Sequence, residues 1–349
     1  MLTKAGTVKK KLKNAGGVLL LPVLSWVMMA IACRIAGTAL FTGIGTWQLF
    51  FRGLAYVLLL SFGVSINMHT GRFDFSAGAT MLIGGVSGAL IAYGNGWGPV
   101  AMLAVSMLVG CATGLVTGWL YVLLRLPPMI IGLTMTLVLE GAVAIITDGC
   151  KPVGFGTDAT YYRFAVTPGW MLLIMLAALA LMVVLFHYTE FGYDYRALQT
   201  GQRIAVGSGV GEDGNAIGCY AVAGLLFGAA GALSVCSTNG VTPTISFSSI
   251  ASMFSCFLPL FFSGFIIKFC NKQLAILMGC VAYELIQIGF GQLSFVDAGF
   301  TADVYKVVEA LILVLFLIYL NNERAIAELV TLRRWMRRRG AVRKEQEGA

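Results

Sequence analysis

Apolar stretches of about twenty residues recur along the whole chain, each long enough to cross the hydrocarbon core of a bilayer as an α-helix. Of the 349 residues, 58% are hydrophobic and 11% are charged, and the mean hydropathy is +0.85. A soluble protein of average composition carries about a quarter charged residues. Because a backbone in lipid must satisfy its own hydrogen bonds, these stretches predict helices. We therefore expect an all-α, polytopic transmembrane bundle.

The number and spacing of the apolar stretches predict about ten helices. The predicted spans are residues 17–36, 49–67, 75–93, 99–122, 129–148, 169–188, 215–236, 246–266, 273–291 and 303–320. Between the second and third spans, the segment NMHTGRFDFSAG is too polar and too rich in glycine for a continuous helix in lipid. Irregular backbone at that depth is tolerated only where it is packed in protein or lines a wet cavity. We therefore expect a broken helix near residues 67–76.

The distribution of the basic residues predicts the orientation in the membrane, since cytoplasmic loops carry an excess of Lys and Arg. Basic tails at residues 1–16 and 321–349 flank one transmembrane domain at residues 17–320. The two tails carry most of the excess of basic residues. This excess predicts that both termini and the polar segment 189–214 lie in the cytoplasm. The net charge of +8 then reflects this topology and attraction to anionic membrane lipid. Nucleic acid is not an expected partner.

Glycines recur at four-residue spacing within several predicted spans. The pattern involves Gly84 and Gly88, then Gly110, Gly114 and Gly118, and later Gly224 and Gly228. Small residues at this spacing let helices approach closely in lipid, where packing drives association. We therefore expect a tightly packed bundle.

Five polar residues lie at the predicted break and are candidates for a substrate pathway. They are Asn67, His69, Arg72, Asp74 and Ser76. A charged side chain at the centre of a bilayer costs at least about 2.5–3.5 kcal/mol, so such residues are functional candidates. Asn and Asp pair well with sugar hydroxyls, and an arginine can neutralise the aspartate. The other interpretation is that Arg72 and Asp74 form a structural pair at the break.

Glu140 is an isolated carboxylate in the middle of the apolar run LTMTLVLEGAVAI. In a low-dielectric region it must pair with a cation such as Arg72, stay protonated or face water. Proton coupling and a structural pair both fit this position, so Glu140 joins the candidate pathway. Glu284, Gln287 and Glu309 are further polar candidates in predicted spans.

Two motifs between Thr70 and Gly149 carry a family resemblance. They read TGRFDFSAG and RLPPMIIGLTMTLVLEGAVAIITDG. They resemble bacterial ABC-importer permeases of the ribose/galactoside class, in the branched-chain amino-acid and sugar permease family. The family's pattern runs roughly GGIDLSVG and then RLPPFIVTLGTM. The chain departs from it where Glu140 replaces a usual arginine, and where residues 255–264 lack a glycine-rich turn. The resemblance covers about residues 50–235 with specific motifs.

Residues 189–214 resemble the family's cytoplasmic coupling loop. The matching positions are Thr189, Phe191, Gly192, Ala197, Ala205, Ser208 and Gly209. The resemblance implies a short helix that docks into a groove of an ATP-binding subunit. It assigns this coupling role to Ala197, Gly201, Ala205, Ser208 and Gly209.

The chain lacks the motif G-x-x-x-x-G-K-[ST] that cradles nucleotide phosphates, so ATP hydrolysis is expected on a separate chain. ATP and Mg²⁺ would bind that partner, and we expect no catalytic residue and no cofactor in this chain. The eight cysteines show no paired spacing, so no metal site is expected either.

The resemblance implies the pore-forming subunit of an ATP-driven importer in the bacterial inner membrane, which moves a small polar solute, with a monosaccharide as the family's expectation. The implied partners are an ABC ATP-binding subunit, an extracytoplasmic solute-binding protein and a second copy or a paralogue. The alternative is an ion-coupled secondary transporter that uses Glu140 or Asp74. Docking of an ATPase on residues 189–214 would discriminate between the two. The identity of the solute stays open.

Overall fold

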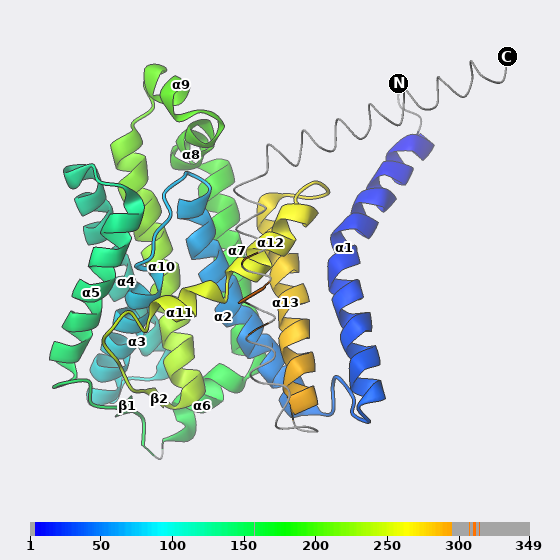
Figure 1. The fold of residues 1–349 in the computed structure, drawn as a ribbon, viewed down its shortest axis with the longest axis horizontal. Coiled ribbons are helices and arrows are strands. Elements are labelled where there is room, and N and C mark those ends of the chain that lie inside the picture. Colours follow the sequence, from blue (N-terminus) through cyan, green and yellow to red (C-terminus); the bar gives the residue numbers. More distant parts are fainter. Residues whose placement is uncertain (1–3, 157, 295–306, 308–309, 312–313, 315–349) are drawn as a thin grey trace. The chain divides into compact units, whose positions relative to one another are not determined.

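The structure is a computed structural model that describes residues 4–156 and 158–294, together with positions 307, 310, 311 and 314. Eight of its described helices are long and apolar enough to cross a membrane. They are α1 (Lys4–Ile35), α2 (Ile44–Met68), α3 (Ala77–Gly94), α4 (Pro99–Leu124), α5 (Pro128–Ile146), α7 (Pro168–Tyr188), α10 (Glu212–Thr238) and α13 (Lys272–Ser294). The all-α, multi-pass fold expected from the apolar stretches is confirmed (Figure 1).

Shorter elements connect these helices. They are β1 (Val153–Gly154), α6 (Ala159–Val166), α8 (Glu190–Thr200), α9 (Gln202–Gly207), β2 (Gly240–Val241), α11 (Ile250–Phe254) and α12 (Phe257–Ile266). The two strands pair in antiparallel fashion, with Val153 opposite Val241. In Figure 1, α8, α9 and the start of α1 lie at one end of the bundle, and β1, β2 and α6 lie at the other end.

The predicted break after the second span is confirmed. Helix α2 ends at Met68 and α3 begins at Ala77, so residues 69–76 form an irregular connection between two membrane-length helices. At the predicted span 246–266, the helical part is shorter and is divided at Ser255 and Cys256. Pro259 stands in the first turn of α12, where proline is tolerated, but it could not continue a helix from α11. The predicted span 303–320 lies outside the continuous described residues.

The glycine pattern has the packing role expected of it. A Cβ atom on Gly224 of α10 would lie 2.2 Å from the carbonyl oxygen of Gly110 on α4. One on Gly228 would lie 2.1 Å from the carbonyl oxygen of Ser106, and one on Gly84 of α3 would lie 2.9 Å from the Cα of Gly228. Helices α3, α4 and α10 are therefore in backbone contact, which only glycine permits at these positions.

Candidate solute pathway and coupling segment

Helix α5 holds the broken segment in place. Thr136 donates a hydrogen bond from Oγ1 to the carbonyl oxygen of Phe75, at 3.1 Å. A Cβ atom on Gly132 would lie 2.5 Å from the amide nitrogen of Phe75, so the two backbones touch at that point. The irregular backbone is thus packed within protein, which is the condition for its presence at membrane depth.

Arg72 and Asp74 do not form the structural pair considered from the sequence. The Arg72 guanidinium is 3% exposed, and its Nη2 lies 3.7 Å from Oε1 of Glu212, in the first turn of α10. It also lies 5.8 Å from the ring centroid of Tyr121. Asp74 accepts a hydrogen bond from the amide of Ser76, at 2.8 Å, so its carboxylate binds the backbone at the start of α3.

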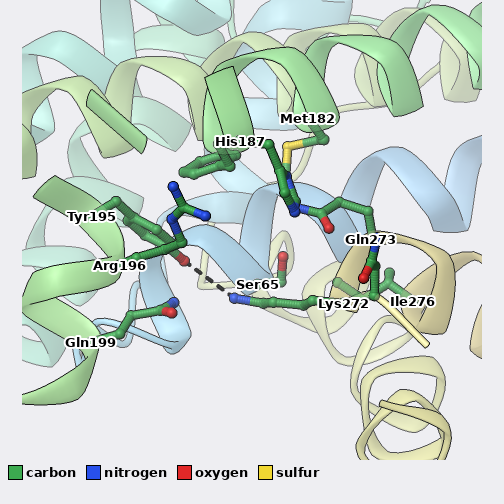
Figure 2. A pocket seen from close by; sticks show the side chains of 11 residues that line it. Ser65, Met182, His187, Tyr195, Arg196, Gln199, Lys272, Gln273 and Ile276 are labelled. Atoms are coloured by element: carbon green, nitrogen blue, oxygen red, sulfur yellow. Dashed lines mark hydrogen bonds between the residues drawn. The ribbon is translucent and has the colours of Figure 1, made fainter. Parts of the chain in front are cut away.

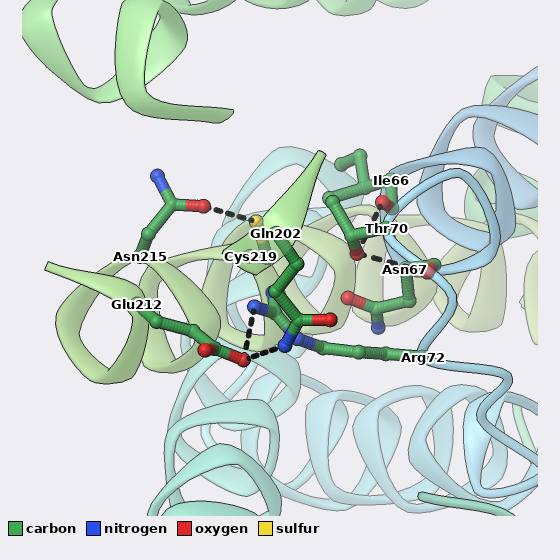
Figure 3. Close-up of polar contacts among 8 residues, drawn as sticks. All are labelled: Ile66, Asn67, Thr70, Arg72, Gln202, Glu212, Asn215 and Cys219. Carbon is green, nitrogen blue, oxygen red and sulfur yellow. Dashed lines mark hydrogen bonds and ion pairs between the residues drawn. The ribbon is translucent and has the colours of Figure 1, made fainter. Parts of the chain in front are cut away.

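The remaining polar residues of the break are placed differently from one another. Asn67 is buried, and neither atom of its amide has a hydrogen-bond partner in the described chain. Ser76 is buried at the start of α3, and the exposed His69 has its Nδ1 2.7 Å from the carbonyl oxygen of Ser65. Nε and Nη1 of Arg72 also have no hydrogen-bond partner in the described chain. Figure 3 shows Asn67 beside Arg72, so unmatched polar atoms gather at this point.

A buried polar atom without a partner costs about 1–3 kcal/mol, which makes the Asn67–Arg72 pair unusual in a packed bundle. The prediction that residues 67–76 serve a solute pathway is compatible with this cluster. Asn67 and Arg72 are the members whose buried polar atoms lack a partner among the described residues, so these atoms could bind a solute or water.

Glu140 is engaged with backbone rather than with a cation. Its side chain is 2% exposed and accepts hydrogen bonds from the amides of Phe247 and Ser249, at 2.9 and 3.0 Å. The hydroxyl of Ser249 donates a third, at 2.6 Å. The suggested pair of Glu140 with Arg72 is therefore wrong, because Arg72 pairs with Glu212 and the carboxylate is satisfied by these donors.

The segment that Glu140 holds is conformationally strained. Ser246 and Phe247 have φ angles of 96° and 60°, which non-glycine residues rarely adopt. Because Glu140 binds the amide of Phe247 itself, its carboxylate stabilises this conformation. A Cβ atom on Gly78 of α3 would lie 1.9 Å from the carbonyl oxygen of Ser249, so the strained segment also packs on the start of α3.

A cavity of about 210 Å³ opens between α3, α10 and the strained segment. Hydroxyl side chains form much of its lining, and no lining residue is charged. The hydroxyls belong to Ser234, Thr242, Thr244, Ser248, Ser249 and Ser252. This cavity is not among the sites expected from the sequence, although the hydroxyl-rich run TPTISFSS before α11 is a signal for it.

The coupling segment is helical, as the resemblance implied. Thr189 caps α8 by accepting a hydrogen bond from the amide of Gly192, at 3.3 Å. A Cβ atom on Gly192 would lie 2.5 Å from the carbonyl oxygen of Leu185, so the glycine lets α8 fold closely against the end of α7. Of the predicted coupling residues, Ala205 is buried, Ala197 and Gly201 are half-buried, and Ser208 and Gly209 are exposed.

Three contacts join the coupling segment to the transmembrane helices. The hydroxyl of Tyr195 donates to the carbonyl oxygen of Ile66 at 3.0 Å, one residue before Asn67. Asn215 of α10 donates to the carbonyl oxygen of Phe191, at 3.1 Å. Gln202 of α9 donates to the Glu212 oxygen that also faces Arg72 (Figure 3). The coupling segment therefore contacts the end of α2, next to the break, and the start of α10.

The other polar candidates lie away from this region. Glu284 is buried on α13, and a Cβ atom on Gly53 of α2 would lie 1.9 Å from its Oε1. Gln287 donates a hydrogen bond to the hydroxyl of Tyr283 on the same helix. Glu309 lies outside the described residues.

Comparison with known proteins identifies the family. A family model described as "Branched-chain amino acid transport system / permease component" matches residues 46–317, which is more than half of the chain. The ribose import permease protein RbsC of Bacillus subtilis is 27% identical over 194 residues, 53% of this chain and 59% of that protein. RbsC of Escherichia coli K12 is 27% identical over 196 residues, 53% and 60% of the two chains.

The autoinducer 2 import system permease protein LsrC of Yersinia pseudotuberculosis is 26% identical over 191 residues, 53% of each chain. The chain spans less than two thirds of the length of each of these relatives. The family model, which extends beyond these matches, covers helices α2 to α13. The chain therefore belongs to the family of permease components of branched-chain amino acid transport systems.

Proposed function

We propose that this protein is the pore-forming subunit of an ATP-driven importer that carries a neutral, hydroxyl-rich solute, such as a monosaccharide, into the bacterial cytoplasm. The observation that carries the proposal is the hydroxyl-lined, uncharged cavity between α3, α10 and the segment before α11. The printed functions of the relatives, ribose import and autoinducer 2 import, support a polar solute of this kind.

The chemistry of the cavity favours a polyol over an amino acid. Serine and threonine hydroxyls both donate and accept hydrogen bonds, which suits the hydroxyls of a sugar. A zwitterionic amino acid would bring charged groups into a cavity whose lining has no charged side chain to pair with them. Burying an unpaired charge is costly. Glu140, the carboxylate behind this cavity, already accepts three hydrogen bonds from residues 247 and 249. The solute would therefore meet hydroxyls and no free charge.

An ABC ATP-binding subunit would dock on α8 and α9. Tyr193, Ile204 and Val206 are exposed apolar side chains on these two helices. Exposed apolar side chains close together on a polar segment are typical of a protein–protein contact. ATP and Mg²⁺ would bind that partner. We further propose an extracytoplasmic solute-binding protein and a second copy or paralogue that completes the pore.

The same topology supports a proposal for the location of the chain. Eight described helices can cross a membrane, and the start of α1 lies at the same end as α8 and α9 (Figure 1). We propose the bacterial inner membrane, with this end and both termini in the cytoplasm. A push on α8 and α9 would then reach the break through Tyr195 and Ile66, and through Gln202, Glu212 and Arg72.

The alternative, an ion-coupled transporter, needs a carboxylate that gains and loses a proton during each cycle. Glu140 uses both oxygens to hold a strained backbone segment, and Asp74 holds the amide of Ser76. Exchange of a proton at either site would disturb these hydrogen bonds. The geometry therefore favours the ATP-driven importer.

The test is co-purification of the tagged chain from native membranes, combined with uptake of labelled ribose. We expect an ABC-type ATPase to co-purify, and we expect its loss when Tyr193, Ile204 and Val206 are changed together to serine. Uptake should persist when a protonophore collapses the ion gradient and ATP is maintained. Uptake that stops with the gradient, and no ATPase among the co-purified proteins, would overturn the proposal.

A further inference from the structure

A separate cavity of about 210 Å³ lies among α7, α8 and α13, at the end of the bundle that carries α8 and α9 (Figure 2). Three of its lining residues are basic in type, namely His187, Arg196 and Lys272, and none of its lining residues is acidic. Helix α7 ends at Tyr188, and α13 begins at Lys272. The cavity therefore lies where two membrane-length helices begin and end, which is the depth of the lipid headgroups.

The cations of this cavity have no acidic partner within the described part of the chain. Lys272 donates to the hydroxyl of Tyr195 at 3.4 Å, and that hydroxyl donates to Ile66. Arg196 donates from Nε to the carbonyl oxygen of Gly192, at 3.3 Å, and lies 4.5 Å from the ring centroid of Tyr193. Among the residues that the structure describes, neither cation forms an ion pair with a carboxylate. Two positively charged side chains that face one cavity, with no carboxylate paired to either, indicate an anionic ligand.

Buried polar atoms around the same cavity also lack partners. The side chain of Gln273 is 6% exposed, and its Oε1 has no hydrogen-bond partner within the described chain. The same holds for Nε2 of Gln199 and Nδ1 of His187. Such atoms cost free energy when nothing binds them, so they point to a polar ligand with both acceptors and donors.

An apolar groove adjoins the basic cavity. It has a volume of about 480 Å³ and shares His187, Asn271 and Gln273 with the cavity. Its other walls include Leu179 and Val183 of α7 and Leu274 of α13. A soluble phosphate compound would leave this groove empty, whereas the acyl chain of a lipid would fill it.

We propose that this cavity binds the headgroup of an anionic phospholipid, with the phosphate between Lys272 and Arg196 and an acyl chain in the adjoining groove. Gln273 would accept a hydrogen bond from a headgroup hydroxyl, which makes phosphatidylglycerol a suitable probe. Lys272 already contacts Tyr195 of α8 (Figure 2). A bound lipid would thus stiffen the contact between α8 and α13. That consequence for coupling rests on the proposed function, whereas lipid binding does not.

The test is a titration of the full chain, purified in detergent and stripped of lipid, followed by native mass spectrometry. The probes are phosphatidylglycerol and phosphatidylcholine with the same acyl chains. We expect tighter binding of phosphatidylglycerol. Lys272→Gln should weaken it about fivefold, the usual effect of one cation near an anionic lipid. The matched control is Lys268→Gln, an exposed lysine in the loop that precedes α13 and outside the cavity, which should change binding less than twofold.

Arg196→Gln provides a second variant if Lys272→Gln does not fold, and we expect it to weaken phosphatidylglycerol binding in the same way. Equal binding of both lipids to the wild-type chain would overturn the proposal. So would unchanged binding in both variants, or displacement of the lipid by glycerol 3-phosphate at equal concentration. Each result is independent of solute transport, so failure of the lipid site is distinguishable from failure of the proposed function.

Discussion

Nη2 of Arg72 lies 3.7 Å from Oε1 of Glu212, so an ion pair joins the break after α2 to the first turn of α10. The same Glu212 oxygen accepts a hydrogen bond from Gln202 of α9. Glu212 is therefore shared between the coupling segment and the candidate solute pathway. If α9 moves, Arg72 moves with it as long as both of these contacts hold.

We expect Glu212→Gln to uncouple the two regions, because it removes the charge that faces a buried guanidinium. The pair is partly exposed, so a double-mutant cycle with Arg72→Gln should give a coupling free energy of only about 1 kcal/mol. ATP-dependent uptake should fall more than this small stability change explains. Asp213→Asn, on the next and exposed residue of the same helix turn, is the control and should leave uptake unchanged. Equal effects of the two substitutions would contradict a specific role for Glu212.

Gly224 is expected to tolerate no side chain, because its missing Cβ would lie 2.2 Å from the carbonyl oxygen of Gly110. Gly224→Ala should push α4 and α10 apart and destabilise the protein by about 1–3 kcal/mol, as overpacking usually does. Thermal unfolding in detergent measures the change. Gly214→Ala is the matched control on the same helix, where nothing lies within 4 Å of the added methyl group. A stability loss of the same size in both variants would refute the packing argument.

Glu140→Gln should destabilise the segment before α11. The substitution removes a carboxylate that accepts three hydrogen bonds, and bonds to charged groups contribute about 1.5–3 kcal/mol each. Ser249→Ala removes one of the three donors and should cost about 1 kcal/mol. Thermal unfolding should therefore rank the wild type above Ser249→Ala, and Ser249→Ala above Glu140→Gln. If Glu140→Gln unfolds at the wild-type temperature, the carboxylate does not hold the strained backbone.

Local features of the sequence were enough to predict the break at residues 67–76 and the glycine contacts. Polar residues and glycines interrupt an apolar run there, and four-residue spacing places glycines on one helix face. The partners of the charged residues could not be predicted in the same way. Arg72 meets Glu212, and Glu140 meets residues 247 and 249, across sequence separations of more than a hundred residues. Periodicity within a helix carries no information about such contacts.

The same limit explains why the hydroxyl-lined cavity and the basic cavity were missed. Each is formed by side chains from at least three segments, and no single segment carries its chemistry. Lys272 follows a loop and Arg196 belongs to the coupling segment, so nothing in the sequence pattern indicates that the two line one cavity. The two residues line one cavity because α8 folds back against α7, a close approach that Gly192 permits.

The cavity between α3, α10 and the segment before α11 makes a prediction about solute recognition. Thr242 and Ser252 line it, and their hydroxyls have no hydrogen-bond partner among the described residues, so they are available to a sugar. Thr242→Val and Ser252→Ala should each raise the KM for uptake about three- to tenfold, since one hydrogen bond contributes about 0.5–1.5 kcal/mol. The maximal rate should change little, because neither hydroxyl lies in the contacts that join α8 and α9 to the break. Ser237→Ala, a serine of α10 outside the cavity, should leave KM unchanged. A fall in the maximal rate with an unaltered KM would instead assign these residues to the conformational cycle, and the hydroxyl-lined cavity would then not be where the solute is recognised.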